Sequence, residues 1–491
     1  MKRSVVFLEL NEAEKYFIAK GIAADKLPSL KRMFREGASL TTNISDWEPA
    51  GERAWRGIMP WMIWPSVYTG MTPAEHDIIA FGQDTSSIQG RCLWDVLDRG
   101  GISTGVCGSL RSYPPRSAGS ACFYIPEALA DDAECFPEDA RPVQEFCIFT
   151  ARNYSESFLS TAFTATQMLL RSARSGVRPG TMLRILGQPL REKLQGAAVF
   201  PERALLQSKV QMDAFRHLYS RYHPQFATLH MNHVAYMQHR YWRATEPERF
   251  KDELSPIDRQ WFETVEDRKA NEAKFSHWIE RSLVYTDGLM AELMKLVDDE
   301  TIVVMASALG QRPYDPVGEI HNPAARLIDE NGLFGAIGVD GFEALTQMNP
   351  DLTLNFPSEE RASLAAGLIS GLRVHDVLFW VERRGCQVFL ELNVPCPRGH
   401  DALPPIRHPD YPDLAAAVSD HITMPVATDQ STAQHRDEGF LVAWSSGTRL
   451  ETTRTQIPVT DIAPMILSWY GLEPAAWMHP SNGPAIRVCS G

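Results

Sequence analysis

Hydrophobic residues along the chain gather in short continuous runs that are separated by longer stretches with helical periodicity. The runs are rich in β-branched residues and are bounded by turn residues. They are Ser4–Leu10, Ile102–Cys107, Gln225–Met231, Thr301–Ala306, Gly439–Ala443 and Arg487–Cys489. Apolar runs without alternation are typical of strands that are covered on both faces, as in a parallel sheet.

The stretches between these runs predict helices. Leu27–Glu36 is amphipathic and ends at Gly37, and Leu93–Arg99 ends at a pair of glycines. Trp278–Asp298 is a long amphipathic pattern directly before the run at Thr301. Strands that alternate with helices predict an α/β fold: a doubly wound, mostly parallel sheet with helices on both faces.

Two segments interrupt this alternation. Residues 131–222 are helix-rich and basic in the middle, and we predict a helical insertion there. Residues 315–430 contain an apparent hairpin, Val377–Arg383 and Gln387–Asn393, and we predict a small α+β cap. The core domain would then consist of residues 1–130, 223–314 and 431–491.

The net charge and the N-terminal sequence limit which partners and which cellular location we expect. The formal net charge of -13 argues against broad binding to nucleic acid or acidic membranes, but it permits a small anionic substrate in a locally basic cleft. The first apolar run is shorter than a signal peptide requires, and no run approaches the ~20 residues of a membrane span. We therefore expect a cytoplasmic protein without a membrane span. The pattern does not indicate an oligomeric state.

Several separated motifs, in order, resemble the type I phosphodiesterase/nucleotide pyrophosphatase branch of the alkaline phosphatase superfamily. The resemblance begins at the end of the first predicted strand and spans nearly the whole chain apart from the two insertions. The matching segments are Leu8–Glu12 with Leu27–Ala38, Trp64–His76, Met237–Trp242, Gln434–Ala443 and Val459–Leu472. Members of this family hold two divalent metals, usually zinc, with Asp and His ligands, and a Thr or Ser attacks phosphorus.

Most of the residues that this resemblance implies are replaced. Asn11 stands at the first Asp ligand, Ile63 at the nucleophile and Ala235 at a further Asp. Ala308 and Leu309 stand at an Asp–His pair. The family's two-metal mechanism with a hydroxyl nucleophile is therefore not expected here.

His239 and His435 remain, and in the family both belong to one metal site. They would hold a single zinc or other divalent ion only if a further ligand completed the set. The candidates for that ligand are Glu9, Glu12, His233, His400 and Asp401. We assign no cofactor beyond this one conditional metal.

Polar residues persist near the predicted strand ends, where open α/β sheets bind ligands. The candidate catalytic residues are His239, His435, His233, Glu9 and Asn11. The candidate residues for binding a small anionic substrate are Asn232, Arg240, Gln311, Arg312, Arg436 and Ser66. In this interpretation a histidine acts as base or nucleophile, and an arginine balances the charge of the substrate.

Each of these residues also has an alternative, purely structural interpretation. His239 can be a packing residue, Glu9 can form a structural ion pair, and the arginines can be solvated surface charges. The basic stretch Arg171–Lys193 is interpreted as a solvated helical face or, alternatively, as a patch for a partner or lipid headgroup.

Three functions follow from these alternatives. The first is an enzyme that acts on a phosphate- or sulfate-type ester or a nucleotide-linked metabolite by altered chemistry. The second is a catalytically inactive pseudoenzyme that binds an anionic ligand or scaffolds a pathway. The third is a conventional two-metal enzyme that draws its ligands from Asp77, Asp84, Asp287 and Asp401.

Overall fold

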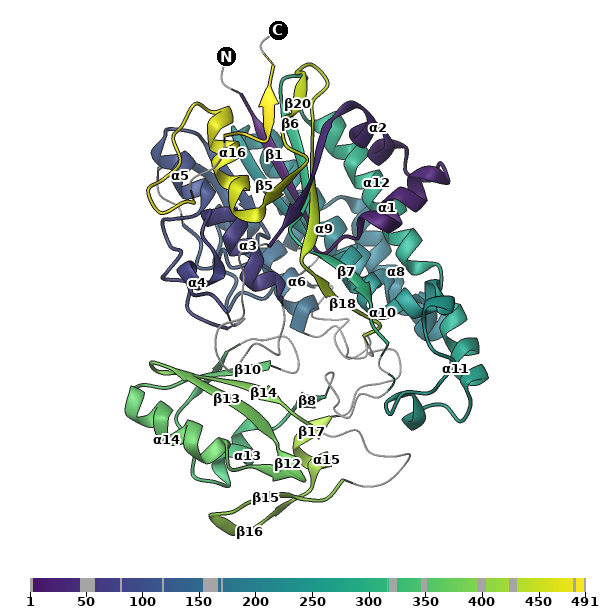
Figure 1. Cartoon of the computed structure of the whole chain (residues 1–491), viewed down its shortest axis with the longest axis vertical. Coiled ribbons are helices and arrows are strands. Elements are labelled where there is room, and N and C mark those ends of the chain that lie inside the picture. The colour runs from purple at the N-terminus through teal and green to yellow at the C-terminus, as the bar shows by residue number, and fades with distance from the viewer. Residues whose placement is uncertain are drawn as a thin grey trace.

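A computed structural model describes residues 3–44, 58–79, 82–116, 119–152, 167–168, 171–315, 317, 325–345, 351–394, 403–423, 431–479 and 483–489. Its centre is an eight-stranded sheet with the strand order β21-β2-β19-β6-β1-β5-β3-β4 (Figure 1). Only β19 runs antiparallel to its neighbours. The strands are β1 Val5–Leu10, β2 Ala38–Asn43, β3 Thr104–Cys107, β4 Ala121–Ile125, β5 Phe226–Met231, β6 Ile302–Ser307, β19 Glu438–Trp444 and β21 Gln456–Pro458.

The prediction of a mostly parallel, doubly wound sheet is confirmed, with one strand placed differently. The run at Arg487–Cys489 forms β22 (Ile486–Val488), which pairs with β20 (Leu450–Thr452) outside the main sheet. The run instead forms a small antiparallel pair. β1 lies between β5 and β6, so the ends of these three strands meet at one edge of the sheet.

Helices cover both faces of the sheet because β1 alternates apolar side chains between two cores. Val6, Leu8 and Leu10 pack in one core, and Val5 and Phe7 pack in the other. The first core is built with α1 (Lys15–Ala23), α2 (Pro28–Glu36), α9 (Glu202–Tyr222), α10 (His233–Thr245) and α12 (Trp278–Leu296). The second is built with α3 (Pro60–Thr69), α5 (Leu93–Arg99) and α16 (Ile462–Trp469).

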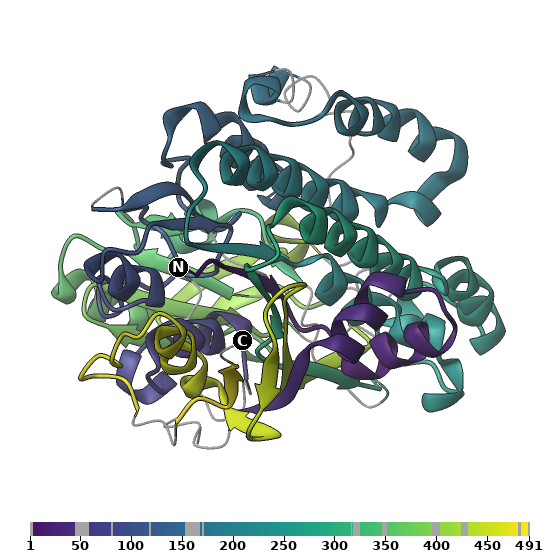
Figure 2. The same ribbon diagram turned by 90° about the horizontal axis from the view of Figure 1, so that it is seen from above.

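Residues 131–222 supply the helices α6 (Arg141–Arg152), α8 (Pro179–Gln195) and α9. α9 packs against β3, β4 and β5, whereas the main contacts of α8 are with α9 and the short turn η4 (Gly196–Val199). α8 therefore lies one layer farther from the sheet. Figure 2 shows these helices stacked outside the sheet at the top of the view.

Residues 325–345, 351–394 and 403–423 form a smaller body with its own apolar core, drawn in green below the main sheet in Figure 1. Its larger sheet has the order β13-β14-β10-β9 and carries α14 (Glu359–Ile369). The predicted hairpin is confirmed as β13 (Phe379–Arg384) and β14 (Gln387–Leu392). At its tip Arg384 forms an ion pair of 2.5 Å with Asp77 of the larger body. The boundaries that we assign to the insertions remain predictions.

The remaining elements of the smaller body are short. They are β8 Arg326–Leu327, β9 Glu343–Leu345, β10 Asp351–Asn355, β11 Arg373–Val374, β12 Asp376–Val377, β15 Ile406–His408, β16 Tyr411–Ala416, β17 Ile422–Thr423, α13 Glu330–Gly335 and α15 Val418–His421. Across the described residues of the whole chain, no helix has the length and apolarity needed to cross a bilayer.

Candidate functional site

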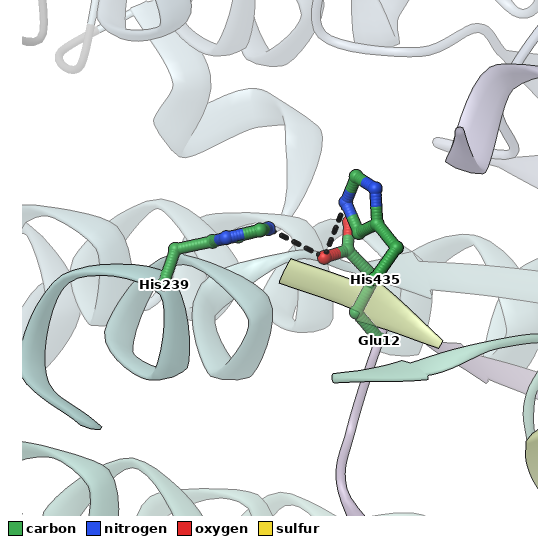
Figure 3. Close-up of side chains that lie close together, drawn as sticks. All are labelled: Glu12, His239 and His435. Carbon is green, nitrogen blue, oxygen red and sulfur yellow. Dashed lines mark hydrogen bonds and ion pairs between the residues drawn. The ribbon is translucent and has the colours of Figure 1, made fainter. Parts of the chain in front are cut away.

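Glu12, His239 and His435 meet at the edge of the sheet where β1 ends, and we call this group the Glu12 site. The Oε2 atom of Glu12 lies 2.7 Å from Nε2 of His239 and 3.0 Å from Nε2 of His435 (Figure 3). The donor atoms of the three residues all lie within 4.8 Å of one another, and no other such group of His, Cys, Asp or Glu occurs among the described residues. The carboxylate is buried, whereas the side chains of His239 and His435 are 28% and 17% exposed. Solvent therefore reaches the imidazoles but not the carboxylate between them.

A kink in α10 and a short strand hold the two histidines together. At Tyr241 the backbone of α10 leaves helical geometry (φ -122°, ψ 15°), which removes the usual helix partner of the His239 carbonyl. Thr432 replaces it: its N–H donates to the His239 carbonyl at 2.6 Å, and its Oγ1 accepts from the N–H of Arg243 at 3.3 Å. Thr432 directly precedes β18 (Ala433–Arg436), which carries His435 and pairs with β7 (Gly310–Pro313). The contact between α10 and the segment at Thr432 therefore fixes the positions of the two imidazoles relative to each other.

The hydrogen bonds of His239 are compatible with a cation at its Nε2 atom. Its Nδ1 atom lies 3.1 Å from the carbonyl oxygen of Ala433 and 3.2 Å from Oγ of Ser431. A carbonyl only accepts hydrogen bonds, so in one tautomer Nδ1–H donates to Ala433 and Nε2 keeps a lone pair. In the other tautomer Nδ1 accepts from the Ser431 hydroxyl and Nε2–H donates to Glu12 at 2.7 Å. Histidines that bind metals typically donate their second N–H to a carbonyl, as in the first tautomer.

Neighbouring amides orient the Glu12 carboxylate. The Nδ2 atom of Asn11 donates to Oε1 at 3.0 Å, and the Nε2 atom of Gln311 donates to Oε2 at 2.5 Å. The indole of Trp64 donates to Oδ1 of Asn11 at 2.8 Å and so fixes which end of that amide faces Glu12. The backbone of Glu12 adopts a left-handed conformation (φ 52°), and its carbonyl accepts from Gln238 at 2.8 Å. Strained, buried polar residues of this kind concentrate at functional sites.

In the Glu12 site, the histidines favour the ionised form of Glu12, and Glu12 favours the protonated form of His435. Burial by itself would raise the pKa of Glu12, but the imidazoles of His435 and His239 hold that pKa well below its usual value. Burial would lower the pKa of His435, but the Glu12 carboxylate outweighs this effect and raises it. At neutral pH the site therefore presents a carboxylate, a ligand type that suits a divalent cation together with imidazole.

Glu9 lies three residues before Glu12 but belongs to a separate and enclosed group, which we call the Glu9 cluster. Its carboxylate accepts hydrogen bonds from Tyr68 at 2.7 Å, Ser109 at 2.8 Å and Nδ1 of His230 at 3.0 Å. Burial, and then the negative charge of Glu9, raise the pKa of Tyr68 well above its usual value. All four side chains are buried, so this cluster connects β1, β5 and α3 inside the protein.

The structure brings some of the other predicted residues to the Glu12 site and not others. Asn11 and Gln311 contact Glu12, and Asn232 accepts a hydrogen bond from Asn11 at 2.8 Å. His233 is buried between Ser208 and Thr286, and burial lowers its pKa to about 3.

The remaining predicted residues have other partners. Ser66 is buried and contacts His76 at 3.1 Å. The guanidinium of Arg436 pairs with Glu438 at 2.8 Å and lies 3.5 Å from Glu14. Arg240 stacks on the ring of Tyr236, and Arg312 lies on β7 beside Gln311 with an exposed side chain. His400 and Asp401 lie outside the described residues.

The positions that the sequence resemblance assigns to the family's nucleophile and lost ligands carry apolar side chains. Ile63, Ala308 and Leu309 are fully buried, and Ala235 is nearly so. None of them offers a donor atom to a metal or a phosphate. In contrast, Glu12 supplies a carboxylate to the two remaining histidines from a different element.

Sequence reasoning did not identify two residues that shape these sites, Trp64 and His230. His230 pairs with Glu9 only because β1 and β5 align Glu9 opposite His230, a register between distant segments. Trp64 reaches Asn11 from α3. Glu12 was one of several candidate metal ligands, and its convergence with both imidazoles follows from the turn after β1.

Comparison with protein families gives one match. The sequence model of the type I phosphodiesterase / nucleotide pyrophosphatase family matches residues 59–362. The chain therefore belongs to this family. A search of curated proteins finds no match.

Three solved structures show a weak similarity to this chain. Human ectonucleotide pyrophosphatase / phosphodiesterase 5 is 10% identical, with 98% of this chain and 97% of that chain covered and a TM-score of 0.37. Phosphonoacetate hydrolase from Sinorhizobium meliloti 1021 is 14% identical, with 90% of each chain covered and a TM-score of 0.35. Alkaline phosphatase PafA is 12% identical, with 99% and 98% covered and a TM-score of 0.42.

Proposed function

We propose that this chain is an enzyme that acts on a small phosphate- or sulfate-type ester, or on a nucleotide-linked metabolite, with one divalent cation held by Glu12, His239 and His435. The observation that carries the proposal is the convergence of one carboxylate and two solvent-accessible imidazoles within 4.8 Å. One carboxylate with two histidines is a ligand set found in catalytic zinc sites.

The donor set fits a cation for a second reason, the hydrogen bond of His239 to Ala433. In the tautomer whose Nδ1–H donates to Ala433, Nε2 is free to coordinate. When bound, a divalent cation would supply Lewis acidity that polarises an ester and neutralises negative charge on its oxygens. Asn11 and Gln311 hold the Glu12 carboxylate in place, and Asn232, exposed beside Asn11, is positioned to contact an anionic substrate.

The chemistry must differ from that of family members that use a side-chain hydroxyl. Ile63 cannot attack phosphorus or sulfur, so the attacking oxygen has to come from water or from a second substrate. The conventional two-metal alternative gains no support from its described candidates. Asp287 accepts from the N–H of Leu30, Asp77 pairs with Arg384 and Asp84 accepts from Ser86.

The test is a metal and activity titration of the full chain after chelation. Zinc or manganese is added while binding is measured by calorimetry and turnover with chromogenic phosphomonoester, phosphodiester and sulfate esters. We expect one metal per chain, metal-dependent turnover and at least about a 100-fold loss of metal affinity in His239→Ala. His479→Ala is the matched control, because His479 forms a partly exposed ion pair of 2.7 Å with Glu75 elsewhere. Two metals per chain, or equal metal affinity in His239→Ala, would contradict the proposal.

A second candidate is a catalytically inactive protein that binds an anionic ligand or scaffolds a pathway. The burial of Ile63, Ala308 and Leu309 favours it, since these side chains leave no polar surface where relatives place the attacking group. It predicts that phosphate or sulfate raises the unfolding temperature while none of the esters is turned over, with or without metal. The predicted cytoplasmic location applies to both candidates.

A further inference from the structure

The outer helix α8 carries a continuous row of exposed leucines. Leu183, Leu186, Leu190 and Leu194 are 70%, 42%, 61% and 73% exposed, and Phe200 just beyond the helix is 42% exposed. They make up five of the twelve large hydrophobic side chains that are exposed among the described residues. Single exposed leucines are ordinary, but a cluster of five within eighteen residues indicates an interaction surface.

The leucines lie on the side of α8 that faces away from the protein. At about 100° per residue, the four leucines fall within an arc of about 80°. The buried residues of the helix, Thr181, Ile185 and Gln188, are centred about 180° from that arc. α8 packs on α9, so its opposite face is directed outward, and Figure 2 shows it in the outermost helical layer. The leucine row is thus a second apolar face that the described fold does not cover.

Basic residues flank the leucine row on both sides. By the same helical geometry Lys193 lies about 20° beyond one edge of the arc, and Arg191 and Arg184 lie about 60° and 80° beyond the other. Arg184 and Lys193 form no ion pair within the described part of the chain, whereas Arg191 lies 3.5 Å from Glu202. The only carboxylate between residues 171 and 200 is Glu192, which is turned inward onto Arg203 at 2.6 Å. The surface around the leucines is therefore positively charged, although the chain as a whole carries -13.

We propose that the leucine face of α8 binds a membrane surface that contains anionic lipids, with the helix lying in the plane of the interface. An amphipathic helix with leucines on one face and cations along its borders has the composition of interfacial helices. Its 17 residues span about 26 Å, and its charges and its buried opposite face exclude a transmembrane orientation. Charge complementarity favours anionic lipid over a second copy of this chain, because two α8 faces would bring like charges together.

The acidic remainder of the chain does not prevent this contact. Exposed charges beyond about 8 Å are largely screened at physiological salt, so the field at the leucine face is set by the nearby cations. The net charge of -13 argues against broad membrane binding, and α8 is a local exception to that expectation. Each basic residue near an anionic bilayer adds a modest increment, and the leucines supply the larger apolar contribution.

The experiment measures co-sedimentation of the full-length protein with vesicles of phosphatidylcholine alone or of phosphatidylcholine mixed with phosphatidylserine. We expect binding to the mixed vesicles, weak binding to phosphatidylcholine alone and a decrease as salt is raised. Leu186→Gln combined with Leu190→Gln should weaken binding at least about tenfold. Leu364→Gln is the matched control, because Leu364 is 64% exposed on α14.

A charge-reversing double variant and its control test how much the basic residues contribute to membrane binding, apart from the leucines. Arg184→Glu combined with Lys193→Glu should weaken binding to mixed vesicles at least about tenfold at low salt, and Lys15→Glu, an exposed cation on α1, should leave it unchanged. Far-UV circular dichroism of each variant confirms that the fold persists. Absence of binding to mixed vesicles at low salt would overturn the proposal. So would self-association of the chain that the leucine variant abolishes, because that result would identify a second copy as the partner.

Discussion

The Glu9 cluster and the Glu12 site place the same residue type in the same region of the fold with opposite outcomes. Both glutamates are buried near the end of β1, and both contact histidine. The partners of Glu9 are enclosed, and the side chain of its histidine, His230, is 5% exposed. The partners of Glu12 remain open to solvent on their outer sides.

This difference separates a structural carboxylate from a candidate catalytic one. Glu9 receives hydrogen bonds from hydroxyl and imidazole groups of α3, β5 and the loop after β3. It therefore connects elements that pack against one another in the core. Glu12 receives two imidazoles whose outer faces a small ion or substrate can reach. Burial of the charge alone does not distinguish the two cases; access to its partners does.

The largest expected effect is on metal binding in Glu12→Gln. The amide removes the negative charge and places N–H groups toward the two imidazoles, so we expect metal affinity to fall about 1,000-fold and turnover to reach background. Calorimetric titration with zinc measures the affinity. Glu14→Gln is the control, since Glu14 is also buried but its carboxylate accepts from Tyr16 and contacts no imidazole of the site. An unchanged zinc affinity in Glu12→Gln would refute the assignment.

The next largest effect is on stability in Glu9→Gln. Tyr68 and Ser109 would lose a charged acceptor in a buried environment, which should cost about 3 kcal/mol in the free energy of unfolding. Urea unfolding measures this change. Zinc affinity should stay within about threefold of the unchanged protein, because the Glu9 side chain makes no described contact with the imidazoles of the Glu12 site. A large loss of metal affinity without loss of stability would show that the two groups act as one site.

Most of the fold could be predicted from the sequence, because apolar runs and helical periodicity are properties of residues that are close together in the chain. Four of the six predicted runs, at Ser4, Ile102, Gln225 and Thr301, form neighbouring parallel strands of the central sheet. The run at Gly439 also joins the sheet but lies antiparallel between β6 and β2, and strand direction is set by the connections rather than by composition.

The site was readable only in part, because its geometry depends on contacts between distant segments. The motif order identified His239 and His435, and the structure places their rings 5.1 Å apart. The separation of Glu9 from Glu12 depends on strand register and on the left-handed turn at Glu12. His233 follows β5 directly, yet the first turn of α10 directs it toward Thr286 and away from the site.

A smaller effect is expected from Trp64→Phe, which tests how the Glu12 carboxylate is oriented. Without the indole N–H, the amide of Asn11 loses the bond that fixes its direction, and zinc affinity should fall about tenfold. Trp94→Phe is a close control, because Trp94 is also buried in the same core but its Nε1 has no hydrogen-bond partner among the described residues. Equal affinities in the two variants would show that Trp64 contributes packing alone.

The smallest effect concerns the pH dependence of stability in the metal-free protein. The pKa of His435 is raised above its usual 6.5 by Glu12, so the folded chain retains a proton that the unfolded chain releases just above pH 6.5. The resulting stabilisation is fully present below pH 6.5 and is lost as the pH rises through the higher folded-state pKa. Urea unfolding with a chelator present, between about pH 6 and pH 9, should show a decline of about 1 kcal/mol that is absent in Glu12→Gln. If the free energy of unfolding depended on pH in the same way in both proteins, Glu12 would not set the protonation of His435. The carboxylate of the Glu12 site would then have a structural role, as in the enclosed Glu9 cluster.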